Sequence, residues 1–380
     1  MKKVIALVLA LSLLLCGCGA KPEETTAPET EPVTEATTEA TTEPTTEPTT
    51  EPPPVYTNPL NGEILEEPFT GRIYAFTISN IREALPHVSV NEADILMEMF
   101  VNYSIIRCLA LYTDISDVEA IGSIRSTRLM FNDIAEHYNL ILHHAAGSKT
   151  VLSDLANRPV DDINLDNWKS YEAGASYRDK QYRRGYEHSL FGNGPGIPAY
   201  AESLGIPLSS EEEVDCGLFF TEDGTPAGGE TADIISVTLT FGGSKKDTVM
   251  KYDPSLGKYV YWQYEKQMND QVTGEPEAFR NVIIMNTNIT RNGQYHVADF
   301  VAGGDGYFAC GGKLIPITWS CEAENAPFRF FTENGEPLML GTGNTYIAIA
   351  PLDSPISWTA VEPEITETTA ETTAETEPTA

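Results

Sequence analysis

The sequence predicts an α+β fold, with a mixed-sheet layered sandwich in the N-terminal part and a β-rich subdomain in the C-terminal part. Apolar runs of strand length recur along the first half of the chain, and few segments of helical period lie between them. Beyond residue 229, strand-like runs follow one another at the spacing of hairpins. Strands and helices do not alternate regularly, which argues against a repeated βαβ fold.

Four segments of the N-terminal part are rich in apolar residues on both faces, as is typical of buried central strands. They are 72–80, 93–101, 105–114 and 139–146. The apolar residues of 126–138 recur at helical spacing, and Ser126 is predicted to cap that helix. A second helix is expected to begin near Ser148, which can cap it.

Turn residues dominate the middle of the chain, 158–230, which predicts long loops with one short helix around 199–204. Seven apolar runs follow, separated by clusters of Gly, Asn, Asp and Pro. They predict strands at 235–241, 258–264, 281–287, 294–301, 306–312, 314–319 and 345–351. We therefore expect an N-terminal α+β domain at 58–228 and a β-rich C-terminal domain at 229–361.

The first residues have the features of a bacterial lipoprotein signal. Lys2 and Lys3 precede an apolar stretch that is too short to span a bilayer. The run LCGC at 15–18 resembles a lipobox, so residues 1–17 are predicted to be removed and Cys18 to carry the lipid. A lipid on Cys18 would anchor the protein at the extracellular face of the cell membrane. A plain secretory signal is the alternative.

Both flanks of the predicted body consist almost entirely of Thr, Glu, Pro and Ala. Residues 18–57 and 362–380 bury too little apolar surface to fold, so they are predicted to be a disordered tether and a disordered acidic tail. The whole chain has a formal net charge of −32. This balance argues against binding to nucleic acid and against docking on an anionic membrane through a basic face.

A series of motifs in the body identifies a known family. They are NPLNGE at 58–63, GRIYAFTISN at 71–80, EADILME at 92–98, IIRCLALY at 105–112, IGSIRSTR at 121–128, NLILHHAAGS at 139–148, EHSLF at 187–191, TGE at 273–275, NVIIMN at 281–286 and GNTYIAIAP at 343–351. On their order and spacing, residues 58–351 resemble the YerB-like lipoprotein family, which occurs mainly in Firmicutes and has no established activity. The resemblance implies a mixed α+β layered sandwich with a β-rich C-terminal part.

The chain departs from the family pattern at three places. Ser123-Ile124 stand where the family usually has Pro-Val, and residues 85–88 replace an Arg-Pro-Gln-Ser-like run. The family's His-Asn-x-Tyr step is replaced by residues 188–191. The loss of this Asn and Tyr argues against an intact family-wide catalytic site.

One group of polar residues is the candidate ligand-binding site. It comprises Arg125, Ser126, Arg128, His144, Ser148 and His188. The two arginines flank the predicted start of a helix, where free N–H groups and guanidinium forks suit a carboxylate or phosphate. The alternative is that they form structural ion pairs with internal acids such as Glu98, Asp114 or Asp133.

The histidines of this group have open alternatives as well. His143 and His144 should point to opposite faces of a strand, and the family resemblance favours His144. His188 lies near the end of a basic, aromatic segment at 177–189. This segment is predicted to be either a lid over an anionic ligand or a solvated loop.

Three functions follow from these residues. The favoured one is binding of an anionic or polar glycan, peptide or phosphate-bearing ligand of the cell envelope. The second is a hydrolase or transferase, with His144 or His188 as acid/base and Ser126 or Ser148 as candidate nucleophile. The third is a structural module that contacts another envelope protein.

Other common chemical signatures are absent from the sequence. No G-x-S-x-G and no H-E-x-x-H occur, so we predict no metal and no cofactor. Of the cysteines that remain after processing, Cys310 and Cys321 are the most plausible disulfide pair, and Cys108 is expected to be a buried thiol.

Overall fold

The computed structural model describes residues 55–179, 185–210 and 214–361. The predicted signal peptide, nearly all of the tether, the acidic tail and part of the predicted lid lie outside these residues. Within them, no helix is both long and apolar enough to cross a membrane.

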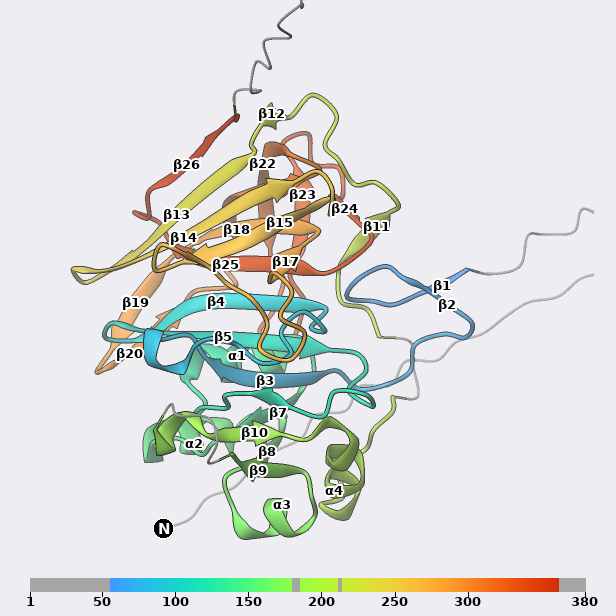
Figure 1. Ribbon diagram of the computed structural model, residues 1–380, viewed down its shortest axis with the longest axis vertical. Coiled ribbons are helices and arrows are strands. Elements are labelled where there is room, and N and C mark those ends of the chain that lie inside the picture. The colour runs from blue at the N-terminus through green and yellow to red at the C-terminus, as the bar shows by residue number, and fades with distance from the viewer. Residues whose placement is uncertain (1–54, 180–184, 211–213, 362–380) are drawn as a thin grey trace, which may run out of the picture. The chain divides into compact units, whose positions relative to one another are not determined.

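A mixed sheet of thirteen strands forms the centre of the body (Figure 1). Its main path runs through β12 (Glu230–Thr231), β22 (Lys313–Ser320), β21 (Gly304–Cys310), β18 (Asn281–Thr287), β25 (Thr345–Pro351), β4 (Ile95–Asn102), β5 (Ile105–Tyr112), β3 (Tyr74–Ser79), β7 (Ile141–His144) and β8 (Asp161–Asn164). β19 (Ile289–Asn292), β20 (Tyr295–Ala298) and β23 (Arg329–Thr332) join it off this path. Because β25 pairs in parallel with both β18 and β4, strands from the two predicted domains form one continuous sheet. The boundary at 228/229 stays a prediction.

A second, six-stranded sheet covers one face of β3, β4 and β5. It contains β16 (Lys266–Gln267), β15 (Lys258–Gln263), β14 (Ser244–Asp253), β13 (Ile234–Phe241), β26 (Ile356–Thr359) and β17 (Ala278–Phe279). Phe76, Leu96 and Cys108 of the main sheet share one apolar core with Met250 and Tyr261 of this sheet. These alternate positions of each main-sheet strand face the second sheet.

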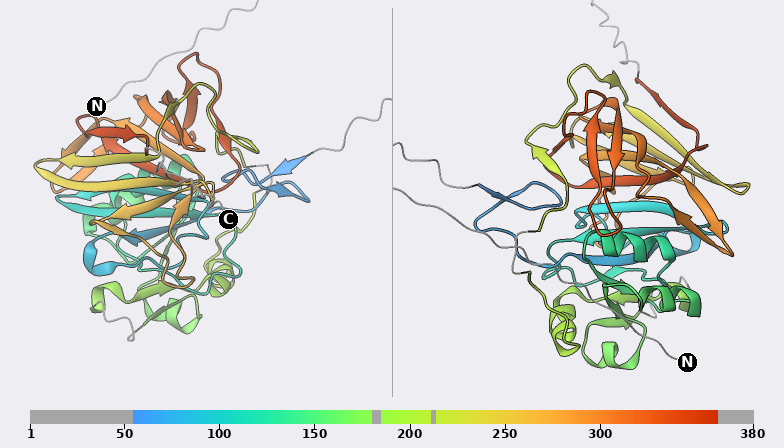
Figure 2. Two further views of the ribbon diagram at one scale, coloured as in Figure 1. Left: turned by 45° about the horizontal axis from the view of Figure 1, so that its top comes forward. Right: turned by 180° about the vertical axis from the view of Figure 1, so that it is seen from behind.

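The opposite face of the main sheet packs against α1 (Leu129–His137), which lies in front of the cyan strands when the molecule is seen from behind (Figure 2). Met97, Leu109 and Leu111 belong to the core on this side, together with Phe131 and Ile134 of the helix. The residues that alternate with the first set therefore face the helix.

The helix predictions are confirmed in position, with one correction. Helix α1 begins after Arg128, whose side chain makes no cap hydrogen bond, so Ser126 is not the N-cap. Helix α2 (Lys149–Leu155) is capped by Ser148 as predicted, because its Oγ accepts from the N–H of Val151. The short helix near residue 200 is α4 (Ile197–Ser203).

Several short elements complete the middle of the chain. They are η1 (Arg82–Ala84), β6 (Ile121–Gly122), α3 (Trp168–Glu172), β9 (Ser176–Arg178), η2 (Tyr186–His188), β10 (Leu190–Gly192) and η3 (Gly194–Gly196). β1 (Tyr56–Thr57) pairs with β2 (Ile64–Leu65), and β11 (Phe219–Thr221) pairs with β24 (Met339–Gly341). The predicted strand-rich fold with mixed sheets and few helices is confirmed.

The predicted disulfide is wrong, because the four described cysteines are free and buried. Cys310 is the last residue of β21, opposite Lys313 at the turn of the β21–β22 hairpin. Cys321 directly follows β22, at the far end of the same hairpin. Seven residues of extended chain separate the two ends by roughly 20 Å, beyond the reach of an S–S bond. Cys108 is buried, as predicted.

Candidate anion-binding site

Three arginine side chains gather at the end of the main sheet. Arg107 belongs to β5, whereas Arg125 and Arg128 lie in the segment that joins β6 to α1. Nη1 of Arg107 and Nη1 of Arg128 both donate to the main-chain carbonyl of Ser126, the second over 3.2 Å. Two guanidinium groups therefore converge on one oxygen atom. We call Arg107, Arg125 and Arg128 the arginine cluster.

Only one carboxylate among the described residues pairs with the arginine cluster. Nη1 of Arg125 donates to the carbonyl of Glu187 over 2.6 Å, and its Nη2 lies 3.2 Å from Oε2 of that residue. The Glu187 side chain is 73% exposed, so this ion pair contributes little to stability. Within the described ranges, Arg107 and Arg128 form no ion pair. Arg128 instead donates to the neutral oxygens of Asn102, Ser126 and Thr127.

The surroundings disfavour the positive charge on both of these arginines. Burial, followed by the charges of Arg128 and Arg125, holds the pKa of Arg107 well below its ordinary value. Burial also lowers the pKa of Arg128 to about 10, with Arg125 adding to the effect and Tyr295 opposing it. Both guanidinium groups still carry a proton at neutral pH. An anion bound here would relieve this unbalanced charge.

The segment that carries Arg125 is held at the carboxyl ends of two parallel strands. The N–H of Arg125 donates to the carbonyl of Thr77 in β3 over 2.8 Å. The carbonyl of Arg125 accepts from the N–H of Ala145, just beyond β7, over 2.9 Å. β3 and β7 pair in parallel, and this end of parallel strands is where open α/β sheets place their ligands.

His144 lies beside the arginine cluster, and both of its ring nitrogens already have partners. Nδ1 is 3.0 Å from the carbonyl of Ala146, which also accepts from the N–H of Thr127. Nε2 is 2.9 Å from Oδ2 of Asp162. Because both partners are acceptors, neither nitrogen is left to activate a nucleophile.

Ser148 is hydrogen-bonded to Tyr295, a residue that no sequence pattern indicated. The hydroxyl of Tyr295, in β20, donates to Oγ of Ser148. Tyr295 also raises the pKa of Arg128, against the lowering by burial. The two partners of this hydrogen bond are 147 residues apart, so no local pattern could have indicated the contact.

The remaining predicted residues lie at the rim. His188 ends η2 and is 6% exposed, next to the Glu187 that Arg125 holds. Ser126 is half-buried, and its hydroxyl makes no hydrogen bond with the described residues. Five residues of the predicted lid, 180–184, are outside the described ranges.

The predicted acidic partners of Arg125 and Arg128 are occupied elsewhere. Glu98 pairs with Lys246 on the opposite face of the main sheet. Asp133 lies 2.5 Å from a guanidinium nitrogen of Arg158. Asp114 accepts instead from the N–H of Ser116. The proposed ion pairs with these three acids are therefore wrong.

A second polar cluster, which sequence reasoning missed, is buried between the two sheets. Lys246, Asn80 and Tyr261 donate to Oε1 of Glu98, and Thr248 and Tyr346 donate to its Oε2. We call these six residues the Glu98 cluster. Burial tends to raise the pKa of Glu98, but Lys246 and the hydroxyl donors hold it below its ordinary value.

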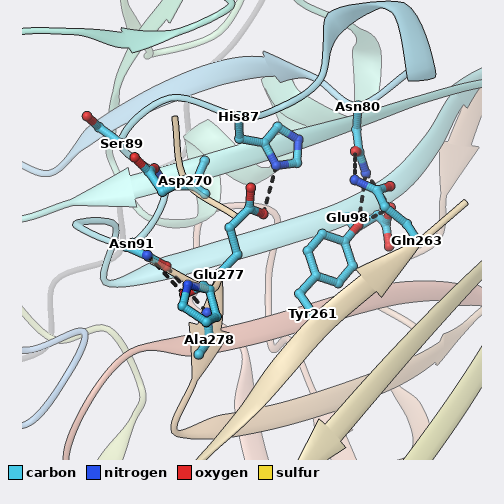
Figure 3. Close-up of polar contacts among 12 residues, drawn as sticks. Asn80, His87, Ser89, Asn91, Glu98, Tyr261, Gln263, Asp270, Glu277 and Ala278 are labelled. Carbon is cyan, nitrogen blue, oxygen red and sulfur yellow. Dashed lines mark hydrogen bonds and ion pairs between the residues drawn. The ribbon is translucent and has the colours of Figure 1, made fainter. Parts of the chain in front are cut away.

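His87 and Glu277 form a neighbouring pair between the two sheets. Figure 3 shows them beside Asn80, Glu98 and Tyr261. Nδ1 of His87 is 2.9 Å from Oε2 of Glu277, and both side chains are fully buried. Among the residues that the structure covers, no group of three or more His, Cys, Asp or Glu could hold a metal ion.

The sequence and the fold match known proteins in both halves of the body. Residues 60–207 match the family described as "Protein of unknown function (DUF3048) N-terminal domain". Residues 237–347 match its C-terminal domain. The chain belongs to the DUF3048 family. The family resemblance predicted from the motifs is thereby confirmed.

The chain is similar to a protein of Bacillus subtilis (strain 168), "Putative lipoprotein YerB". Our chain is 25% identical to it over 303 residues, which cover 77% of our chain and 86% of the relative. The crystal structure of the YerB protein from Bacillus subtilis has a similar fold, with a TM-score of 0.67 at 23% identity. That match covers 79% of our chain and 99% of the other.

Proposed function

We propose that this protein is a lipid-anchored binding protein of the cell surface, and that the arginine cluster binds a carboxylate- or phosphate-bearing ligand of the envelope. The convergence of Arg107 and Arg128 on one carbonyl, with no carboxylate paired to either among the described residues, carries the proposal. Guanidinium forks bind carboxylate and phosphate in a bidentate manner, so a single anion could bridge two of them.

The surroundings of the cluster favour binding over catalysis. Both ring nitrogens of His144 contact acceptors, and general acid–base catalysis needs a nitrogen within reach of the reacting atoms. Oγ of Ser148 already caps α2 and accepts from Tyr295. These side chains would therefore shape and orient a bound anion.

Two observations support the lipid anchor. The chain begins with a lysine-containing, apolar segment and a lipobox-like run that ends at Cys18. The related protein of Bacillus subtilis is called a lipoprotein. The acidic Thr/Glu/Pro segment that follows Cys18 would act as a spacer between the membrane and the body.

A thermal-shift measurement on the full chain tests the binding site. The probes are inorganic phosphate, a hexose phosphate and a muropeptide, each with the natural chain and with Arg128→Met. At a hundredfold excess over Kd, a ligand is expected to raise the Tm by roughly 5 °C or more. Arg128→Met should abolish that rise. It should also raise the Tm without ligand, because it removes one of three neighbouring like charges.

Arg329→Ala is the matched control, because this arginine is partly exposed and pairs with the carboxylate of Asp215. It should leave the ligand-induced shift unchanged. If no probe shifts the natural chain, and Arg128→Met lowers the Tm, the arginines stabilise the fold and the binding proposal is wrong.

A further inference from the structure

A cavity lies on the other side of the main sheet from the arginine cluster. It encloses about 560 Å³ and is lined by Arg82, Lys245, Lys246, Lys251, Trp262 and Tyr264, together with acidic and apolar residues. We call it the basic pocket. In β4 and β5, Met99 pairs with Arg107 and Glu98 pairs with Cys108. Consecutive residues of a strand face opposite sides, so the arginine cluster and the Glu98 cluster are on different faces.

Another cavity adjoins the basic pocket. It encloses about 510 Å³, and its lining includes Gln267, Asn269 and Gln271. Nε2 of Gln267 donates to Oδ1 of Asn269, and Nδ2 of Asn269 donates to the carbonyl of Gly274, which leaves one N–H of each amide for a ligand. We call it the amide pocket. Arg82 and Tyr264 line both cavities, so they form the wall between them. The guanidinium of Arg82 is 4.7 Å from the centre of the Tyr264 ring, which fixes the two side chains as a pair.

The basic pocket carries more positive than negative charge, although the protein as a whole is acidic. Among the described residues Arg82, Lys245 and Lys251 form no ion pair, and Lys251 lies 3.6 Å from the centre of the Trp262 ring. Asp247 and Glu265 also line the pocket. Because Lys246 is neutralised by Glu98, three cations face two carboxylates here. The chain as a whole carries 24 basic and 56 acidic residues.

Residues that line the basic pocket are hydrogen-bonded to the buried polar residues of Figure 3. Nε2 of Gln263 donates to Oδ1 of Asn80 over 2.8 Å, and Lys246 is part of the Glu98 cluster. The hydroxyl of Tyr264 donates to the carbonyl of Asn80 over 3.1 Å. These contacts hold the lining residues in place before any ligand arrives.

The backbone beside Tyr264 is strained. Tyr264 and Glu265 form the turn between β15 and β16, with φ angles of 52° and 62°. Such a turn favours Asn-Gly, because both positions need the left-handed region. Strained residues of this kind concentrate at ligand sites, and here the strain places an aromatic ring between two cavities.

We propose that the basic and amide pockets form one groove for a chain of sugar residues that carry carboxylate or phosphate groups. Lys251 covers one face of the Trp262 ring and Arg82 one face of the Tyr264 ring, and the C–H faces of sugars can pack against the other face of each ring. The amides can bind hydroxyl groups, and Arg82, Lys245 and Lys251 can bind the anionic groups. Two adjoining cavities suit a ligand longer than a single sugar.

Isothermal titration calorimetry with the full chain tests this proposal. The probes are tetragalacturonate for carboxylates, a phosphorylated maltotetraose for phosphates, and uncharged maltotetraose. At least one anionic probe should bind, and more tightly than maltotetraose. The anionic probe that binds shows whether the groove takes carboxylate or phosphate groups. Trp262→Ala and Lys245→Ala should each weaken binding at least tenfold.

Two surface residues of α3 provide matched controls. Trp168 is 73% exposed, and Lys169 follows it. Trp168→Ala and Lys169→Ala should leave the affinity unchanged. Lys245 is exposed, so its replacement keeps the fold intact and gives a clear result.

Two outcomes would overturn the groove. The first is that no anionic sugar chain binds, or that binding is the same in Trp262→Ala and Lys245→Ala. The second is that tetraglutamate binds as tightly as the sugar probes, which would assign the cavities to an acidic peptide. Either result leaves the proposal for the arginine cluster unaffected, because that site has its own variant.

Discussion

Two histidines that are neighbours in the sequence have opposite environments in the structure. His143 and His144 are consecutive in β7, and strand geometry sends them to different faces. His143 stacks on Phe76, with ring centres 4.4 Å apart, and its Nδ1 is 3.1 Å from the carbonyl of Ala75. Burial lowers the pKa of His143 to about 3. The folded protein therefore keeps this imidazole neutral.

His143 should make the folded protein sensitive to acid. Its folded-state pKa lies below the ordinary value of 6.5, so its contribution to stability is complete above about pH 6.5 and is lost as the pH falls toward 3. Between pH 7 and pH 5 the natural chain should lose about 2 kcal/mol more free energy of unfolding than His143→Gln. Denaturant unfolding at both pH values measures the difference, and equal losses would contradict the assignment.

At the scale of an element, the β15–β16 turn contains two residues whose side chains disfavour its backbone conformation. A left-handed residue other than glycine costs about 1–2 kcal/mol. The turn places such residues at both central positions, Tyr264 and Glu265. Tyr264 is held there by its hydrogen bond to Asn80 and by the stacked Arg82. The turn is therefore kept in place by contacts outside the hairpin.

Glu265→Gly should stabilise the protein, because glycine adopts the left-handed region without strain. After subtraction of the larger chain entropy of glycine, the expected gain is about 0.5–1 kcal/mol. The free energy of unfolding from urea denaturation measures it. Lys266→Gly is the control, since Lys266 belongs to β16 and glycine in a strand should destabilise. A loss of stability in Glu265→Gly would show that the turn is not strained.

Local elements were predictable from the sequence, and long-range pairings were not. The apolar runs indicated β3 and β5, and the serine before α2 indicated its cap, because these depend on neighbouring residues. The partner of Glu98 is Lys246, 148 positions away, and nothing near either residue points to the other. Arg107 was overlooked for the same reason: in the sequence it is one cation in an apolar strand. The arginine cluster exists only once β5 lies beside the segment before α1.

For the whole molecule, the family matches show a DUF3048 body, and the sequence predicts a signal segment and an acidic spacer before it. The main sheet uses strands from both matched regions, and the second sheet packs on it through a shared core. The two halves therefore share their core residues. Both proposed sites belong to this body, so a single lipid on the first retained residue would place both at the cell surface.

Cys18→Ser should release the protein from membranes, because the proposed lipid attaches to that thiol. Fractionation of cells that produce the full chain measures this, and nearly all of the variant should appear in the soluble or secreted fraction. Cys16→Ser is the matched control, since Cys16 is proposed to leave with the signal peptide. Membrane retention of Cys18→Ser would rule out this anchor.

β25 is central in the main sheet but late in the order of elements. This strand, Thr345–Pro351, lies between β18 and β4 and follows both of them along the chain. Until it is in place, β18 and β4 have no strand between them to join, so each half needs the other to complete the sheet. A premature stop just before Thr345 would thus delete the middle of the sheet and leave both proposed sites without their scaffold.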